Sequence, residues 1–346
     1  MLHFSIPTIV QGSRDYYLIL SYFFLVRQDK IIVYSTLKFI LVITFATSLL
    51  YIGQMILKRP ILVHYTDRLI LDSSTGLPRF YNLPYFTSLV LFISLFYYSK
   101  LKFKKIVFIG VSLIAIILTL GRTSIVLTMS MIVLGYLIKG NTKYLLIGLV
   151  FVFVLSIPLL GFLVNRFNQA GTSSDFQMLF NGNLKNFDMV ENSDATMTYR
   201  IAWCVERISY LINKGFGSVL FGVGFIGDMD PTVHKLFNFY LGLQDYETGL
   251  ISQIKTPDIA FGNIIARLGF LGGWIWMLIW IRLTKIFYNL RENKLIFCFY
   301  IYIVGSLIGS ISGVGISDTI KFFVFFLILS LIINNDEKSF DNYSLL

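Results

Sequence analysis

Charged side chains are scarce in this sequence of 346 residues: Asp, Glu, Lys and Arg make up 14% of it, whereas a soluble domain carries about 25%. Hydrophobic residues make up 56%, and the mean hydropathy is +0.73. So few charges cannot cover a surface in water, which excludes a soluble globular domain and predicts an integral membrane protein. The apolar runs have the length of helices rather than of short alternating strands, which favours a helical bundle over a barrel.

Cysteine and histidine are also rare, with two and three residues respectively. Cys204 and Cys298 fall in regions that we expect to lie far apart, so no disulfide is expected. His3, His64 and His234 are too scattered for a metal-type Cys/His spacing. The sequence therefore predicts no metal and no cofactor.

The net charge of +10 could indicate nucleic acid as a partner. In a membrane protein, however, excess Lys and Arg is typical of cytoplasmic anchoring charge, and no nucleic acid is expected. The N-terminus has no basic region ahead of an apolar core and so does not resemble a signal peptide. The first apolar run, 16–26, is short and predicts an interfacial segment or the remnant of a longer N-terminal part.

Apolar runs that approach the roughly 20 residues needed to span a bilayer recur along the chain. They are 31–57, 84–100, 104–121, 123–138, 144–164, 262–281, 295–313 and 319–334. Basic clusters lie at 27–30, 100–105, 139–143 and 282–294. Alternation of the spans puts all four clusters on one side, which the positive-inside rule assigns to the cytoplasm.

The predicted fold class is an all-α polytopic membrane protein with about eight or nine transmembrane helices and one large extracytoplasmic loop. The expected parts are a short N-terminal segment (1–30), an N-terminal bundle (31–164), the outer loop (165–258), C-terminal helices (259–334) and a cytoplasmic tail (335–346). A loop as long as 165–258 is usually functional or a small domain.

Arg122 stands alone between two apolar runs in LTLGRTSIVL. The legs from Lys105 to Arg122 and from Arg122 to Lys139 are each about 25 Å long as helices, shorter than the roughly 30 Å hydrocarbon core. We therefore expect a turn at Gly121 that recesses Arg122 below the outer surface. The arginine either snorkels to the headgroups or reaches into an outward-facing cavity and holds an anion.

The outer loop contains a predicted helix that begins near Thr198 and ends at Asn213–Gly215. Two sets of residues occupy different faces of it. Arg200, Trp203 and Arg207 share one face, and Ile201, Val205, Ile208, Leu211 and Ile212 line another. Read alone, Arg200 could equally be an exposed interfacial arginine. A glycine-rich run from Gly215 to Gly227 follows and has no dinucleotide-binding context.

Residues 256–281 lead from the loop into a span. Gly262, Gly269, Gly272 and Gly273 are small residues of the kind that let membrane helices approach closely. Asp258 follows Pro257 and is expected in the first helical turn. There its carboxylate either complements the helix dipole or acts in chemistry.

Four features in this order resemble the bacterial O-antigen polymerase and O-antigen ligase superfamily, which includes polymerases of capsule and exopolysaccharide repeat units (Wzy-type). They are the Arg122-Thr-Ser turn, the Arg200-x-x-Trp203 start of the outer helix, the Gly222-Val-Gly224 turn and the Arg267-Leu-Gly-Phe-Leu-Gly helix start. The resemblance covers about residues 80–335. The family has ten or more helices, so N-terminal helices are short or missing here. The ligase branch has a late-loop histidine where this chain has Asp258.

The resemblance implies a GT-C-like bundle in the bacterial inner membrane, with the active site facing the periplasm or exterior. The donor is a glycan on undecaprenyl diphosphate, and the acceptor is a lipid-linked repeat unit; a chain-length regulator is a further partner to consider. Arginines are expected to bind the diphosphate, because their planar forks match phosphate oxygens. Arg122 and Arg200 are the first candidates, and Arg79, Arg207 and Arg267 are secondary ones.

The base for the acceptor hydroxyl is expected to be Asp258, with Asp67, Asp245 and Glu247 as reserves. Trp203 and Tyr199 could stack on sugars or anchor the loop at the interface. Two alternatives stay open, an O-antigen ligase and a lipid-linked oligosaccharide flippase. The spans have no convincing internal repeat of the kind that many transporters carry, and the missing histidine favours a polymerase over a ligase.

Overall fold

The computed structural model describes residues 6–59, 61–62, 70–71, 78–80, 83–97, 103–119, 121–140, 197–225, 236–237, 253–254, 256, 259–311 and 313–334. The chain divides into two compact units. The first unit comprises 1–15, 157–279 and 310–318, and the second unit comprises 16–156, 280–309 and 319–346.

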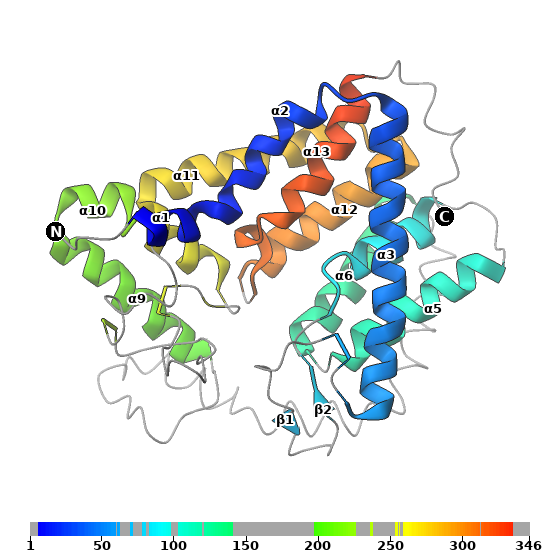
Figure 1. Ribbon diagram of the computed structural model, residues 1–346, viewed down its shortest axis with the longest axis horizontal. Coiled ribbons are helices and arrows are strands. Elements are labelled where there is room, and N and C mark those ends of the chain that lie inside the picture. The colour runs from blue at the N-terminus through cyan, green and yellow to red at the C-terminus, as the bar shows by residue number, and fades with distance from the viewer. Residues whose placement is uncertain are drawn as a thin grey trace. The chain divides into compact units, whose positions relative to one another are not determined.

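Helices dominate the described residues (Figure 1). In chain order the elements are α1 (Ile6–Ser13), the 3₁₀-helix η1 (Arg14–Leu20), α2 (Ser21–Leu25), α3 (Lys30–Leu57), β1 (Ile70–Leu71), β2 (Pro78–Arg79), α4 (Thr87–Phe92), the π-helix η2 (Ile93–Tyr97), α5 (Phe103–Leu118), α6 (Arg122–Ile138), α9 (Met197–Lys214), α10 (Phe216–Phe221), α11 (Ala260–Asn289), α12 (Lys294–Gly309), the 3₁₀-helix η5 (Gly315–Ser317) and α13 (Ile320–Ile333). The two short strands pair antiparallel.

Helices occupy every expected apolar run that falls among the described residues, which confirms that these runs are helical. The run 144–164 lies outside the described residues. Of the described helices, α3 and α11 are long and apolar enough to cross a membrane, whereas α4–η2, α6, α12 and α13 are apolar but shorter. The described part is therefore compatible with an all-α membrane protein, and the count of eight or nine spans stays a prediction.

Two helices differ from the sequence prediction. α11 continues to Asn289 and is interrupted at Gly269, whose backbone is not helical (φ 66°, ψ −173°). α12 ends at Gly309 instead of reaching residue 313. After this helix, residues 310–318 belong to the first unit, where the carbonyls of Ser310 and Gly313 accept the N–H of Ala260.

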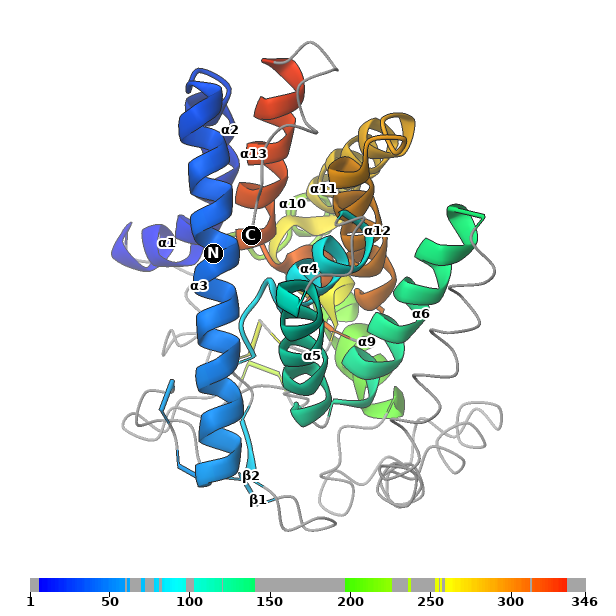
Figure 2. The same ribbon diagram turned by 90° about the vertical axis from the view of Figure 1, so that its right-hand side faces the viewer.

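The second unit is held together by contacts between apolar helix faces. α3 lies against α5 and α13, and α13 also lies beside α2 (Figure 1, Figure 2). α12 approaches α6 through Gly305 and Gly309, where an added Cβ would come within 3.0 Å of Met131 Cγ and 2.7 Å of Leu127 Cδ2. Glycines four residues apart on a helix face are the means by which membrane helices approach closely.

Basic residues from three predicted cytoplasmic clusters meet at one end of the second unit. Lys105 and Lys139 donate to the carbonyls of Leu95 and Phe96, at the C-terminal end of η2, over 3.5 and 3.1 Å. A helix C-terminus favours cations. Apolar surroundings lower the pKa of the Lys139 ammonium, and the charges of Lys294 and Lys105 lower it further. The predicted topology requires these three lysines on the same side.

Candidate functional site

The helix α9 carries most of the predicted site residues that the structure describes, and its end follows the predicted signal. The helix stops at Lys214, and Gly215 adopts φ 102°, a backbone conformation that favours glycine. The prediction of a helix ending at Asn213–Gly215 is confirmed. Arg200 lies half-buried on this helix, and Trp203 is buried to 1% exposure.

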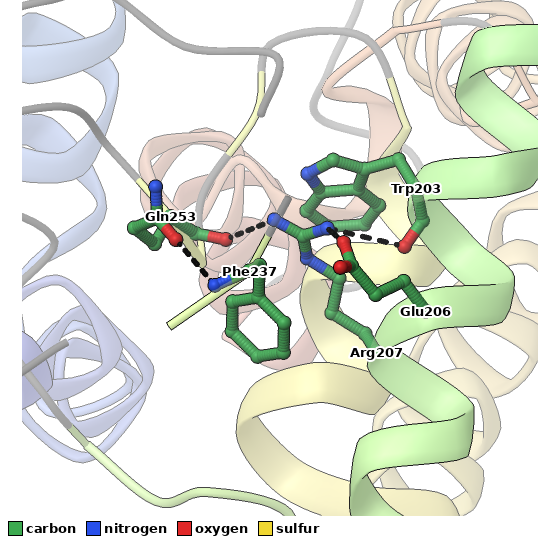
Figure 3. Close-up of polar contacts among 5 residues, drawn as sticks. All are labelled: Trp203, Glu206, Arg207, Phe237 and Gln253. Carbon is green, nitrogen blue, oxygen red and sulfur yellow. Dashed lines mark hydrogen bonds and ion pairs between the residues drawn. The ribbon is translucent and has the colours of Figure 1, made fainter. Parts of the chain in front are cut away.

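Arg207 lies at the centre of a polar cluster in the first unit (Figure 3). Its guanidinium lies between the rings of Trp203 and Phe237, 4.2 Å from each ring centroid. It pairs with the carboxylate of Glu206 at 2.8 Å and donates to the carbonyl of Gln253, also at 2.8 Å. The amide oxygen of Gln253 in turn accepts the N–H of Phe237.

This cluster holds three separate parts of the chain together. The guanidinium of Arg207, from α9, contacts both Phe237 and Gln253. Arg207 is 2% exposed, so its guanidinium contacts Glu206 and two aromatic rings in place of water. A substrate phosphate could reach Arg207 only by displacing these contacts. Arg207 was predicted to contact the diphosphate. Its buried contacts also give it a role in holding the folded unit together, and the sequence did not indicate this role.

Trp203 joins α9 to the start of α11. A Cβ at Gly262 would overlap the indole of Trp203 and come within 2.9 Å of Cys204 Sγ, which confirms Gly262 as a site of close helix approach. Burial raises the pKa of the Cys204 thiol, and the neighbouring Arg207 charge partly opposes this. Both Cys204 and Cys298 are free thiols.

The start of α11 is fixed by a buried amide. Asn263 accepts the N–H of Thr256 at 2.8 Å and donates to the carbonyl of the same residue at 2.7 Å. Both residues are buried, and the pair satisfies backbone groups that precede the helix. Asp258, the predicted base, falls between them in sequence but lies outside the described residues.

The Gly-Val-Gly turn and the break in α11 form one joint. The N–H groups of Val223 and Gly224 donate to the carbonyls of Ala266 and Arg267, each over 2.9 Å. These carbonyls lie in the last turn before the break at Gly269, where the helix no longer satisfies them.

Gly222 and Gly269 let the two backbones touch in this joint. A Cβ at Gly222 would overlap the carbonyl of Arg267, and a Cβ at Gly269 would overlap the carbonyl of Leu220. Both glycines have positive φ, 71° and 66°. Gly269 is therefore more than a small packing residue within a continuous helix, as the sequence had suggested: it ends one helical segment and begins the next.

Arg267 is buried at 6% exposure, and its guanidinium donates to the carbonyl of Gly12 over 3.1 Å. The contact joins α11 to the N-terminal segment of the first unit, 255 residues away in sequence. No sequence signal indicated this contact, because neither the short helix α1 nor its position could be predicted from the pattern.

The remaining predicted residues lie elsewhere. Arg122 is the first residue of α6, and Arg79 is in β2, paired through the backbone with Ile70; both belong to the second unit. Tyr199 is in the first turns of α9. For Arg122, Arg79 and Tyr199 the structure describes the backbone position but not the side chain.

The turn that precedes Arg122 is tight and hydrogen-bonded. Ser124 Oγ donates to the carbonyl of Gly121 at 2.8 Å, and Thr119 Oγ1 accepts the N–H of Gly121 at 3.2 Å. A Cβ at Gly121 would come within 2.7 Å of Ser124 Oγ, so glycine suits this turn. The prediction of a turn at Gly121 is confirmed, and it places Arg122 at the N-terminal end of α6.

Among the described residues, no three His, Cys, Asp or Glu side chains are grouped so that they could hold a metal ion. Comparison with family models gave no match, and neither the curated proteins nor the solved structures gave one.

Proposed function

We propose that the protein polymerises undecaprenyl-diphosphate-linked oligosaccharide repeat units into a surface polysaccharide, on the outer face of the bacterial cytoplasmic membrane. The observation that carries the proposal is the joint between α10 and α11. The features of the resemblance are far apart in sequence, yet the N–H groups of Val223 and Gly224 donate to the carbonyls of Ala266 and Arg267. Trp203, from the Arg-x-x-Trp feature, packs on Gly262 of the same helix. Three of the four features of the resemblance are thus parts of one folded unit.

Arg122 supports the proposed chemistry through its position. A helix N-terminus carries a partial positive charge, so acidic residues are favoured there and a cation is unfavourable by about 0.3–1 kcal/mol. The first turn of α6 contains no acidic residue. The arginine and the helix end therefore add their positive potentials, which favours an anion such as a diphosphate.

In the proposed reaction, the acceptor hydroxyl attacks the anomeric carbon of the donor sugar. The new glycosidic C–O bond forms as the bond to the diphosphate breaks, and undecaprenyl diphosphate leaves with the bonding electron pair. Asp258 is the proposed acceptor of the hydroxyl proton. Negative charge grows on the diphosphate as the bond breaks, so guanidinium groups fixed beside it stabilise the transition state more than the ground state.

Of the predicted cations, Arg122 and Arg200 are the ones we propose to bind the leaving diphosphate. Arg207 and Arg267 already make buried contacts within the first unit, so we propose that they act mainly by holding α9 and α11 in place. Arg79 stays a secondary candidate.

Replacement of Arg122 or Arg200 by lysine tests this assignment, because lysine keeps the charge but loses the planar fork. Loss of one good transition-state donor costs about 10²–10³ in rate. Each variant should insert normally yet give only short glycans on a gel of surface polysaccharide. Arg291→Lys is the matched control, because this guanidinium stacks on Tyr288 in the predicted cytoplasmic turn, and it should give the full ladder.

The break in α11 favours one second candidate, a lipid-linked oligosaccharide flippase, because transporters use interrupted helices whose free carbonyls bind ions. Here the carbonyls of Ala266 and Arg267 accept N–H groups of the protein itself, which favours a structural joint. Deletion of the gene separates the candidates. A polymerase deletion leaves a surface glycan of one repeat unit, a ligase deletion leaves long polymer on the carrier, and a flippase deletion leaves no surface glycan.

A further inference from the structure

The helix α9 is amphipathic, but its apolar stripe points away from the interior of the first unit. The buried face consists of Trp203, Arg207 and Leu211, which are 1–2% exposed. On the opposite side, Val205 and Ile212 are 52% and 59% exposed. A surface helix normally buries its aliphatic stripe and exposes its arginines. The inverted arrangement is the one expected of a helix with an apolar environment on its outer side.

The apolar stripe continues past the end of α9. In α10 Phe216 is 78% exposed and Phe221 is 62% exposed. We name the surface formed by Ile201, Val205, Ile208, Ile212, Phe216 and Phe221 the outward apolar face. The two isoleucines at 201 and 208 are half-buried, at the edge of the stripe.

The outward apolar face carries no charge that a polar protein partner could recognise. Between Ile201 and Ile212 the charged residues are Glu206 and Arg207, and they pair with each other on the other side of the helix. Residues 215–225 contain no charged residue. Lys214, at the C-terminus of α9, is the nearest cation in the sequence.

The level of this face relative to the membrane follows from the joint with α11. From Gly269 to Arg282, where the predicted cytoplasmic cluster begins, the helix is about 20 Å long at roughly 1.5 Å per residue, shorter than the hydrocarbon core of roughly 30 Å. A stripe of exposed apolar side chains, of the kind that face lipid, begins immediately after the break. It is formed by Phe270, Leu271, Trp274, Ile275 and Leu278. On the predicted topology, the break therefore lies about 10 Å below the outer edge of the hydrocarbon.

The Gly222-Val-Gly224 turn binds the last helical turn before the break, so it holds α10 near the same level. We propose that α9 and α10 lie in the outer interface of the bilayer, with the outward apolar face buried in lipid acyl chains and Lys214 at the headgroups. Interfacial helices bury an apolar face about 5–10 Å deep. The occupant is lipid, because the joint holds the end of α10 beside the start of the exposed apolar stripe of α11.

Single-cysteine labelling in vesicles tests the proposal on the full-length chain. The background is Cys204→Ser with Cys298→Ser. Ile212→Cys and Phe216→Cys place an environment-sensitive fluorophore on the outward apolar face. Lys214→Cys is the matched control, because position 214 is exposed but lies on the opposite side of α9 from Ile212 at 100° per residue.

In vesicles of phosphatidylethanolamine and phosphatidylglycerol, an acyl-chain nitroxide should quench the labels at 212 and 216 several-fold more than the label at 214. Aqueous iodide should show the reverse order. All substitutions are at exposed positions, so the unfolding temperature should stay near that of the background. Strong iodide quenching at 212 and 216 would show that water covers the face. Protection from both quenchers would show that protein covers it, a second copy included, and either result overturns the proposal. Neither depends on whether the protein polymerises glycans.

Discussion

The joint between α10 and α11 makes a quantitative prediction for Gly222→Ala. Gly222 has φ 71° and ψ −161°, a region that only glycine occupies readily, and a residue forced into it costs about 1–3 kcal/mol. The new methyl would also overlap the Arg267 carbonyl. That carbonyl belongs to backbone, so it can move away only by separating the two segments.

Separation of the segments breaks the bonds from Val223 and Gly224 to the carbonyls of Ala266 and Arg267. Each is worth about 0.5–1.5 kcal/mol net. With the strain, the loss of stability is about 2–6 kcal/mol. For a unit of this size, 1 kcal/mol lowers the unfolding temperature by roughly 2–4 °C, so we expect a decrease of at least about 4 °C.

The assay uses the protein's own thiol as a reporter. In a Cys298→Ser background, a thiol-reactive fluorophore reports exposure of Cys204, which is in contact distance of α11 at Gly262. Gly217→Ala is the matched control, because Gly217 lies in α10, the short helix that Gly222 follows, and an added Cβ there meets nothing within 4 Å. Both variants are heated at the same rate. If Gly222→Ala unfolds at the same temperature as Gly217→Ala, the joint does not stabilise the unit and this account of the glycines is wrong.

Further predictions concern a cation, a thiol and a glycine. Arg207→Ala should destabilise the first unit by about 1–3 kcal/mol, because it leaves the carbonyl of Gln253 without its donor. Normal thermal stability together with lost activity would instead indicate that Arg207 binds substrate. Burial raises the pKa of the Cys204 thiol. Between pH 7 and about 9, Cys204 should therefore be less ionised in the folded protein than in the unfolded chain and should react more slowly with iodoacetamide. Equal rates would contradict the burial. Gly309→Leu should separate α12 from α6 and lower the unfolding temperature, while Gly110→Leu, at a helical glycine with nothing within 4 Å of an added Cβ, should not.

The helices of this protein could be predicted because their signal is local. Apolar length alone located α3, α5, α6 and α13 within a few residues. The end of α9 was also predicted, since a glycine after a periodic run is a local stop signal. The same reasoning identified Gly262 as a position where a side chain would not fit.

The contacts that build the candidate site could not be predicted, because they join residues far apart in the chain. Arg207 was predicted as a secondary ligand of the diphosphate, and only its bond to the carbonyl of Gln253 and its place between two rings show why it is buried. The break at Gly269 was missed because a glycine in an apolar run is as common in a continuous membrane helix. Its meaning depends on Gly222, which approaches it from another segment.

Reconstitution with a defined substrate tests the proposed activity most directly. The purified protein is placed in vesicles with an undecaprenyl-diphosphate-linked repeat unit, and the products are separated by length and analysed by mass spectrometry. We expect a ladder of glycans that stay on the carrier, one undecaprenyl diphosphate released for each repeat added, and a ladder reduced by about 10²–10³ in rate for Arg122→Lys. A substrate that stays one repeat long in the presence of stable, inserted protein, or that crosses the vesicle bilayer without any new glycosidic bond, would contradict the account.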